Sequence, residues 1–212
     1  MLDPVYYIGI CLGSVLLTLY GKWKNLGILH FGAKFLASLC FVALALERGG
    51  LNSLYGKWIL AALILSLSGD LFLVSKERIP FLSGLVLFLL AHLAYVGAFV
   101  SLDFDLILTL RSFLFVALCT GAIGWWIIPR TPKRMKLPVS AYFLAITSMM
   151  ATALSLSLSG GSWIYATGGA LFCASDVAVA RERFISQTIW NPVAGLPIYY
   201  GAQLILALSI GV

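Results

Sequence analysis

The sequence predicts an all-α membrane protein, an eight-helix transmembrane bundle that forms a single integral membrane domain over residues 1–212. Of the 212 residues, 61% are hydrophobic and only 10% are charged, and the mean hydropathy is +1.02. So few polar side chains cannot cover a soluble globule. The apolar runs are long and continuous and do not alternate with polar residues, which favours helices over the strands of a barrel.

Eight apolar segments are long enough to cross a bilayer as helices. In chain order we expect them at Val5–Tyr20, Leu26–Leu46, Trp58–Val74, Pro80–Ser101, Asp105–Ile128, Lys136–Leu158, Trp163–Ala180 and Pro192–Gly211. The first is expected to be a retained helix, because Asp3 and no basic region precedes it. Tryptophan prefers the membrane interface, and every tryptophan lies at or just beyond an expected end: Trp23, Trp58, Trp125, Trp126, Trp163 and Trp190.

The basic residues predict the orientation of these segments. Ten of the 14 Lys and Arg residues lie in the loops after the first, third, fifth and seventh segments: Lys22, Lys24, Lys76, Arg78, Arg130, Lys133, Arg134, Lys136, Arg181 and Arg183. The opposite loops and the termini hold only Arg48 and Lys57. Because short cytoplasmic loops are rich in Lys and Arg, both termini are expected to be non-cytoplasmic. The formal charge of +6 then reflects topology and contact with anionic membrane lipids, with no nucleic acid as partner.

Two aspartates, Asp70 and Asp176, lie near the cytoplasmic ends of the third and seventh segments. Each is preceded by serine or glycine and followed by apolar residues and a basic stretch. A carboxylate inside the hydrocarbon costs roughly 2.5–3.5 kcal/mol at a helix centre, so it marks chemistry or transport by default. Two of them in matched contexts suggest one shared site.

The spacing of the aspartates also suggests an internal repeat. They are 106 positions apart, which is half of the 212-residue chain. An offset of four segments preserves orientation, so the pattern is typical of two parallel four-helix repeats related by an axis along the membrane normal. Coincidence is the alternative, because the similarity is weak outside the two aspartate segments.

Other polar residues inside the segments are candidates to bind substrate or support the aspartates. Lys34 lies about two turns into the second segment; its charge can snorkel to the interface, pair with an aspartate or bind a lipid phosphate. His92 and Tyr95 share one helix face at i, i+3 spacing, and Tyr199 and Gln203 share another at i, i+4. Hydrogen bonds between helices are the structural alternative for these four. Tyr142 in the sixth segment is a weaker candidate.

The sequence lacks the motifs of several common enzyme active sites and ligand sites. It contains no Gly-x-Ser-x-Gly elbow, His-Glu-x-x-His zinc motif or complete phosphate-binding loop. Only His30 and His92 are present, and the four cysteines stand isolated in apolar runs. We therefore expect no metal site and no disulfide.

Four short segments carry a resemblance to a known family. They are Ser68–Leu73, Phe88–Tyr95, Phe172–Asp176 with Arg183-Phe184, and Tyr199–Gln203. In order along the chain they resemble the signature segments of the YhhN-like lysoplasmalogenase family, multi-pass membrane alkenyl ether hydrolases. That family commonly has a Lys-Pro pair in its second span, whereas Lys34 is followed by Phe35 here.

The resemblance implies hydrolysis of the vinyl ether bond of lysoplasmalogens to a fatty aldehyde and a glycerophospho-alcohol, either glycerophosphoethanolamine or glycerophosphocholine. It also implies that Asp70 and Asp176 are the catalytic pair and that the partner is a lysophospholipid substrate. The chemistry agrees, since one carboxyl can protonate the vinyl ether while the other stabilises the oxocarbenium ion and orients water. Such a reaction uses protons and water, so no cofactor is expected.

Two other classes of function remain open from the residues alone. A proton- or cation-coupled transporter or lipid flippase would also need intramembrane acids and often contains repeats. A noncatalytic scaffold could pair its aspartates with Lys34. The expected location is the cytoplasmic membrane for a bacterial protein and the endoplasmic reticulum for a eukaryotic one.

Overall fold

The structure, a computed structural model, describes residues 3–75 and 77–212, which form eight α-helices and one short 3-10 helix. In chain order they are α1 (Pro4–Trp23), α2 (Gly27–Glu47), α3 (Leu54–Phe72), α4 (Arg78–Val100), α5 (Leu106–Ile127), η1 (Ile128–Arg130), α6 (Lys133–Leu158), α7 (Ile164–Phe184) and α8 (Trp190–Leu208). Lys76, one of the loop cations, lies outside the described residues. The predicted all-α fold class is confirmed for the described part of the chain.

Capping explains why several helices begin where they do. The side chain of Asp3 accepts a hydrogen bond from Val5 N at 2.9 Å at the start of α1. Ser53 Oγ accepts from Gly56 N at 3.0 Å, so α3 begins four residues before the expected Trp58. Such caps satisfy backbone N–H groups that have no partner inside the helix. Hydropathy marks only the apolar part of a helix, and it therefore misses a capped polar first turn.

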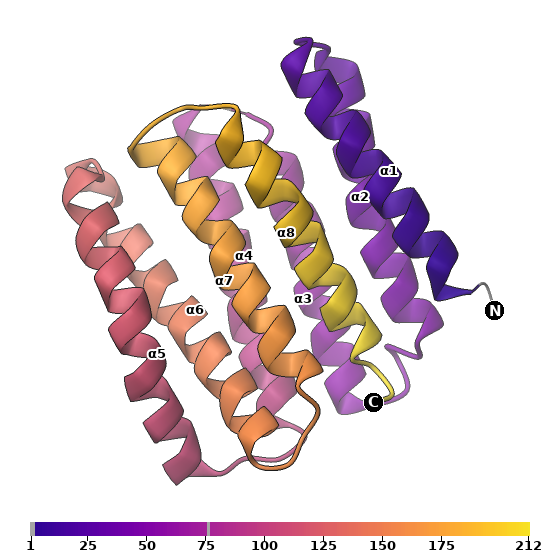
Figure 1. Cartoon of the computed structure of the whole chain (residues 1–212), viewed down its shortest axis with the longest axis vertical. Coiled ribbons are helices and arrows are strands. Elements are labelled where there is room, and N and C mark those ends of the chain that lie inside the picture. The colour runs from indigo at the N-terminus through magenta and orange to yellow at the C-terminus, as the bar shows by residue number, and fades with distance from the viewer. Residues whose placement is uncertain (1–2, 76) are drawn as a thin grey trace.

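The helices pack side by side as an antiparallel bundle (Figure 1). The pairs α1 with α2 and α5 with α6 lie on opposite flanks, and α3, α4, α7 and α8 lie between them. Each helix packs against the next along the chain except α4, which packs chiefly against α3 and α6, and α2 also packs against α8. Both chain ends lie at one end of the bundle, and the connections that follow α1, α5 and α7 lie at the other.

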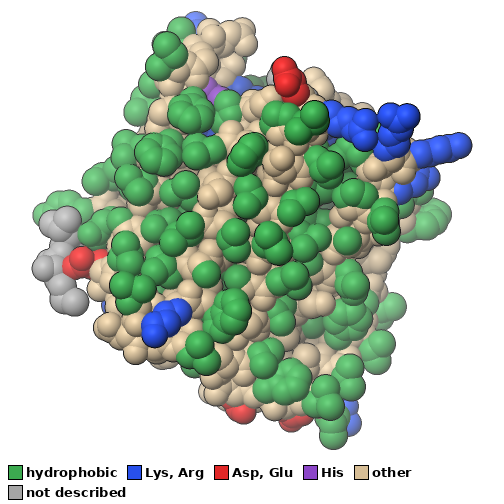
Figure 2. All heavy atoms as spheres, turned by 180° about the vertical axis from the view of Figure 1, so that it is seen from behind, with side chains coloured by type: hydrophobic (Ala, Val, Ile, Leu, Met, Phe, Trp, Pro, Cys, Tyr) green, Lys and Arg blue, Asp and Glu red, His purple; other side chains and the backbone are tan. Residues whose placement is uncertain are grey.

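The surface and the helix composition are those of an integral membrane protein. Within the described residues, the first six α-helices are long and apolar enough to cross a membrane. The fifth of these spans, Leu106–Arg130, consists of α5 and η1 together. Helices α7 and α8 are not among these six, and α7 carries Asp176, Arg181, Glu182 and Arg183. Large apolar side chains cover the face shown in Figure 2. On α5, Leu114 and Leu118 are 69% and 75% exposed, as expected for a helix in contact with lipid.

Glycines bring the central helices close together next to the aspartates. A Cβ atom added to Gly69, the residue before Asp70, would lie 2.7 Å from the ring of Phe88 on α4. A Cβ atom on Gly195 of α8 would lie 2.9 Å from Ala178 on α7. Small residues at such positions let helix backbones approach closely. Here they allow α3 to pack closely against α4, and α7 against α8, at the level of the two aspartates.

Candidate functional site

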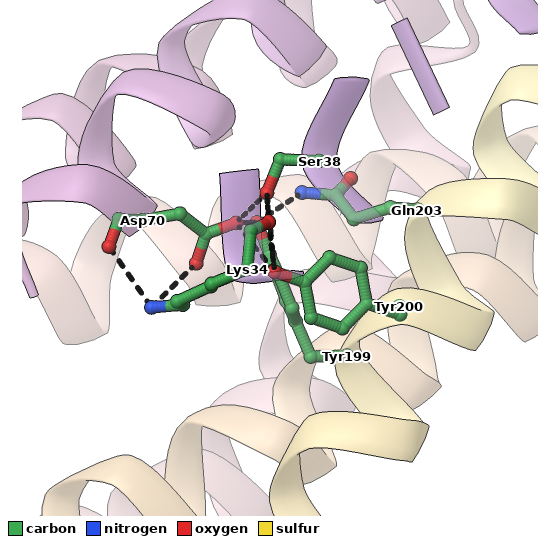
Figure 3. A network of polar contacts seen from close by, with 6 residues as sticks. All are labelled: Lys34, Ser38, Asp70, Tyr199, Tyr200 and Gln203. Atoms are coloured by element: carbon green, nitrogen blue, oxygen red, sulfur yellow. Dashed lines mark hydrogen bonds and ion pairs between the residues drawn. The ribbon is translucent and has the colours of Figure 1, made fainter. Parts of the chain in front are cut away.

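Asp70 on α3 accepts hydrogen bonds from two other helices (Figure 3). Its Oδ2 accepts from Ser38 Oγ at 2.7 Å and from Tyr199 OH at 2.8 Å, and Tyr200 OH lies 3.4 Å away. Its Oδ1 lies 3.1 Å from Lys34 Nζ. Asp70 is only 2% exposed and Lys34 only 6%. An ammonium and three hydroxyl groups are the partners of an ionised carboxylate, so we assign Asp70 as an anion paired with Lys34.

A chain of hydrogen bonds extends from Asp70 into the core. Tyr199 OH donates to Asp70 and accepts from Gln203 Nε2 at 3.1 Å. The amide oxygen of Gln203 in turn accepts from Tyr95 OH at 2.5 Å. Gln203 and Tyr95 are both fully buried, so this chain satisfies polar groups that would otherwise be costly inside the bundle.

Asp176 on α7 has a different and smaller set of partners. Tyr142 OH on α6 donates to Asp176 Oδ2 at 2.8 Å, and His92 Nε2 on α4 lies 3.6 Å from the same oxygen. The side chain of Asp176 is 17% exposed, compared with 3% for that of Asp70. Asp176 therefore contacts no cation comparable with Lys34 among the described residues, and it is more open to the cavity.

One hydrogen bond of His92 determines which ring nitrogen carries the proton. Its Nδ1 lies 2.6 Å from the carbonyl oxygen of Phe88. A carbonyl can only accept, so Nδ1 is the donor and the neutral ring has its lone pair on Nε2. Nε2 is buried and has no hydrogen-bond partner, although it points toward Asp176. Nε2 of His92 and the carboxylate of Asp176 would both be acceptors without a shared proton. We therefore infer that the His92–Asp176 pair can hold one proton.

Both aspartates line one cavity of about 590 Å³, a size typical of small-molecule sites. Lys34, Tyr142, Tyr199 and the apolar side chains of several helices line it as well. From the aspartates the cavity reaches the end of the bundle that holds the α1–α2 and α7–α8 connections, where Lys22 and Glu182 lie 3.7 Å apart. An apolar pocket with a charged mouth suits an amphiphile.

Most of the residues that the sequence singled out are brought together here. Of the alternatives left open for Lys34, the structure has the pairing with Asp70 and not snorkelling. His92, Tyr95 and Gln203 do not line the cavity. Tyr95 on α4 donates to Gln203 on α8, which is the hydrogen bond between helices stated as the structural alternative, whereas the hydrogen bond of His92 is to Phe88 on its own helix. Sequence reasoning missed Ser38 and Tyr200. Ser38 follows Lys34 by one helical turn, and that spacing was the available signal.

The two aspartate centres are built alike. Asp70 on α3 has partners on α2 and α8, and Asp176 on α7 has partners on α6 and α4. Adding four to the helix numbers turns α2 and α3 into α6 and α7. It turns α8 into α4 when the count returns to α1 after α8. The chemistry of the partners nevertheless differs, because Lys34 accompanies only the first centre.

The described residues contain no group of three or more His, Cys, Asp or Glu side chains that could hold a metal ion. All four cysteines are free, and only Cys173 among them lines the cavity.

Comparison with known proteins adds to this geometry. The chain is 28% identical over 157 residues to the lysoplasmalogenase TMEM86A of Bos taurus, covering 71% of this chain and 64% of the relative. It is 34% identical over 149 residues to a lysoplasmalogenase of Mycobacterium tuberculosis, covering 68% and 55%. It is 33% identical over 178 residues to the lysoplasmalogenase TMEM86B of Mus musculus, covering 81% and 70%. The chain thus spans less than two thirds of the length of the first two relatives.

No solved structure matches the chain. The model of the YhhN family matches residues 29–210, which include every residue of the two aspartate centres. This match covers most of the sequence, and the chain therefore belongs to the YhhN family.

Proposed function

We propose that this protein hydrolyses the vinyl ether bond of lysoplasmalogens, releasing a fatty aldehyde and glycerophosphoethanolamine or glycerophosphocholine. The observation that carries the proposal is that two aspartates with unlike partners line one apolar cavity. The names of the relatives support the substrate class. Vinyl ether hydrolysis needs a proton donor and a negative charge, and unlike surroundings can divide these roles between two carboxyls.

We assign the proton donor as Asp176. Its neighbour His92 presents an unpartnered Nε2, so a proton resides between these two groups. Asp176 is also the more exposed of the two carboxyls. In the first step the proton moves to the β-carbon of the vinyl ether, the double bond is consumed, and an oxocarbenium ion forms at the carbon bonded to oxygen.

Asp70 then acts as the permanent anion. Lys34 and the hydroxyl donors keep it ionised and fixed in the cavity wall, where its charge favours the oxocarbenium ion. Water adds to this carbon and gives up a proton to the Asp176 carboxylate, which restores the acid. The resulting hemiacetal breaks its bond to the glycerol oxygen and yields the aldehyde and the alcohol. The sum is one water consumed per bond broken, so the reaction needs no cofactor.

The shape of the cavity suits a lipid with one chain. Its apolar walls, among them Phe88, Leu85 and Ile146, offer a place for the alkenyl chain. The headgroup phosphate would lie at the mouth, where Lys22 lines the same cavity. In a lysoplasmalogen the vinyl ether adjoins the glycerol, which matches the position of the aspartates between tail and mouth.

We further propose that all eight α-helices span the membrane, as two parallel four-helix repeats, with both termini non-cytoplasmic. The matched partners of Asp70 and Asp176 support the repeat. The common position of both chain ends, opposite the basic connections, supports the orientation. The cavity mouth then faces the cytoplasm and the inner headgroup layer.

The alternative is a proton- or cation-coupled transporter or a lipid flippase, which the buried Lys34–Asp70 pair would also suit. One assay separates the two. Purified protein in detergent is given a lysoplasmalogen without any gradient, and fatty aldehyde is measured. Aldehyde release supports hydrolysis, whereas flux that occurs only in sealed vesicles, without aldehyde, supports transport.

A further inference from the structure

A second cavity lies beside the first, at the same end of the bundle. It measures about 490 Å³ and is bounded by the start of α4, the connection η1, the first turn of α6 and the last turn of α7. Five of its eight lining residues are cations: Arg78, Arg130, Lys133, Arg134 and Arg183. None of these eight residues is acidic. Figure 2 shows Lys and Arg side chains gathered at the upper corner where the α5–α6 connection lies.

The charges of this basic cavity converge from four separate elements and do not form a single run along one helix. Arg130 is fixed by donating from Nη1 to the carbonyl oxygen of Trp126 at 2.5 Å. The guanidinium of Arg183 lies 4.2 Å from the ring centroid of Phe81, a cation–π contact. Held cations around a concavity recognise phosphate oxygens at defined positions, which a diffuse basic surface does not.

Apolar groups adjoin the cations. Met135 is 5% exposed, and Phe184 packs edge-on against Phe81 with ring centroids 6.1 Å apart. A free anion needs no such neighbours, whereas the glycerol and first acyl carbons of a lipid would contact them. Basic cavities between membrane helices near the headgroup layer are typical lipid headgroup sites.

The charge separates this ligand from the proposed substrate. The ethanolamine or choline of a lysoplasmalogen is itself a cation and would be repelled by five cationic side chains. A headgroup that has a phosphate and no amine keeps its negative charge and is attracted. We propose that the basic cavity binds the headgroup of an anionic glycerophospholipid, such as phosphatidylglycerol, as a site beside the aspartate cavity, with which it shares only the lining residues Arg183 and Phe184.

The test compares two double variants that remove the same charge from the same end of the bundle. K133Q/R134Q alters the basic cavity, and K24Q/K136Q alters two exposed cations that line neither cavity. Detergent-purified protein is incubated with equal amounts of phosphatidylglycerol and phosphatidylethanolamine, and the lipids retained on the folded protein are counted by native mass spectrometry. No substrate is present, so the result is independent of hydrolysis.

We expect the wild-type protein to retain phosphatidylglycerol preferentially, at one molecule per chain. Each cation near a headgroup contributes about 1 kcal/mol, so K133Q/R134Q should weaken this retention about 30-fold. The K24Q/K136Q protein and the charge-preserving K133R/R134K protein should retain the lipid within about threefold of wild type. Gel filtration of every variant identifies loss of fold.

Equal weakening in both double variants would mean diffuse attraction and would overturn the proposal. So would a wild-type protein that shows no preference for phosphatidylglycerol. Displacement of the lipid by millimolar inorganic phosphate would identify free phosphate as the ligand and reject the lipid. Displacement by equimolar lysophosphatidylethanolamine would make the basic cavity part of the substrate site, which also contradicts a separate site.

Discussion

Lys34 contacts Asp70 at two points. Its Nζ lies 3.1 Å from the carboxylate Oδ1 and donates to the backbone carbonyl oxygen of the same residue at 2.9 Å. The ammonium therefore fixes both the side chain and the helix end that carries it. No described group does the same for Asp176, and this asymmetry underlies the assignment of one aspartate as anion and the other as acid.

The first prediction concerns the two carboxyls. D70N and D176N should each lower aldehyde release from a lysoplasmalogen by about 100-fold to 10,000-fold, because an amide supplies neither an acidic proton nor a negative charge. The double variant should lose much less than the product of the two, since groups that act as a unit are not additive. D103N, at an exposed acid far from the cavity, is the control and should retain near-normal turnover. Near-normal turnover in D70N or D176N would remove that residue from the catalytic pair.

The second prediction concerns the buried ion pair. K34M leaves Asp70 charged and unpaired, so it should destabilise the protein by about 3–5 kcal/mol. K34M/D70N removes both charges and should be more stable than K34M alone. Unfolding by a denaturing detergent in mixed micelles measures both. If the double variant is the less stable one, Lys34 and Asp70 do not depend on each other for stability.

Tyr199 and Tyr200 form a matched pair for the third prediction. Tyr199 OH lies 2.8 Å from Asp70 Oδ2, whereas Tyr200 OH lies 3.4 Å from the same oxygen. Tyr199 lines the cavity and Tyr200 does not. A hydrogen bond to a charged group contributes about 1.5–3 kcal/mol, so Y199F should lower kcat/KM by about 10-fold to 100-fold. Y200F should lower it by less than about fivefold. Equal losses of kcat/KM in Y199F and Y200F would show that lining the cavity does not determine a tyrosine's contribution to catalysis.

His92 is a positioning residue, and its variants separate proton handling from packing. H92N can keep the donor to the Phe88 carbonyl but removes the nitrogen that faces Asp176. We expect kcat to fall about 10-fold to 100-fold with little change in KM, a smaller loss than in D176N. H92F removes both groups and should in addition lower thermal stability. A change in KM alone would indicate a role in binding instead.

The fifth prediction tests the orientation. On a background without native cysteines, N52C and P132C place exposed thiols in the α2–α3 and η1–α6 connections. A membrane-impermeant thiol reagent added to sealed vesicles of one orientation should label one position from outside and the other only after lysis. Labelling of both from the same side would contradict eight spans.

The sequence by itself determined which segments are helices and which polar residues are costly inside them. A bilayer penalises unpaired backbone groups and buried charge wherever they occur, so continuous apolar runs and the lone Asp70 and Asp176 are informative without any partner being known. Helical spacing also put Tyr199 and Gln203 on one face. Helix starts such as that of α3 were missed where a polar cap, Ser53, extends the helix beyond its apolar part.

Only the tertiary structure decided which side chains meet. Lys34 could have paired with either aspartate, and the packing of α2 against α3 and α8 directs it to Asp70. The same packing adds Ser38 and Tyr200, whose residue types are common in membrane helices and carried no signal alone. Spacing along one helix defines a face, but the rotation and crossing of neighbouring helices define what that face contacts. The unlike surroundings of Asp70 and Asp176, from which their separate roles are inferred, arise at that level.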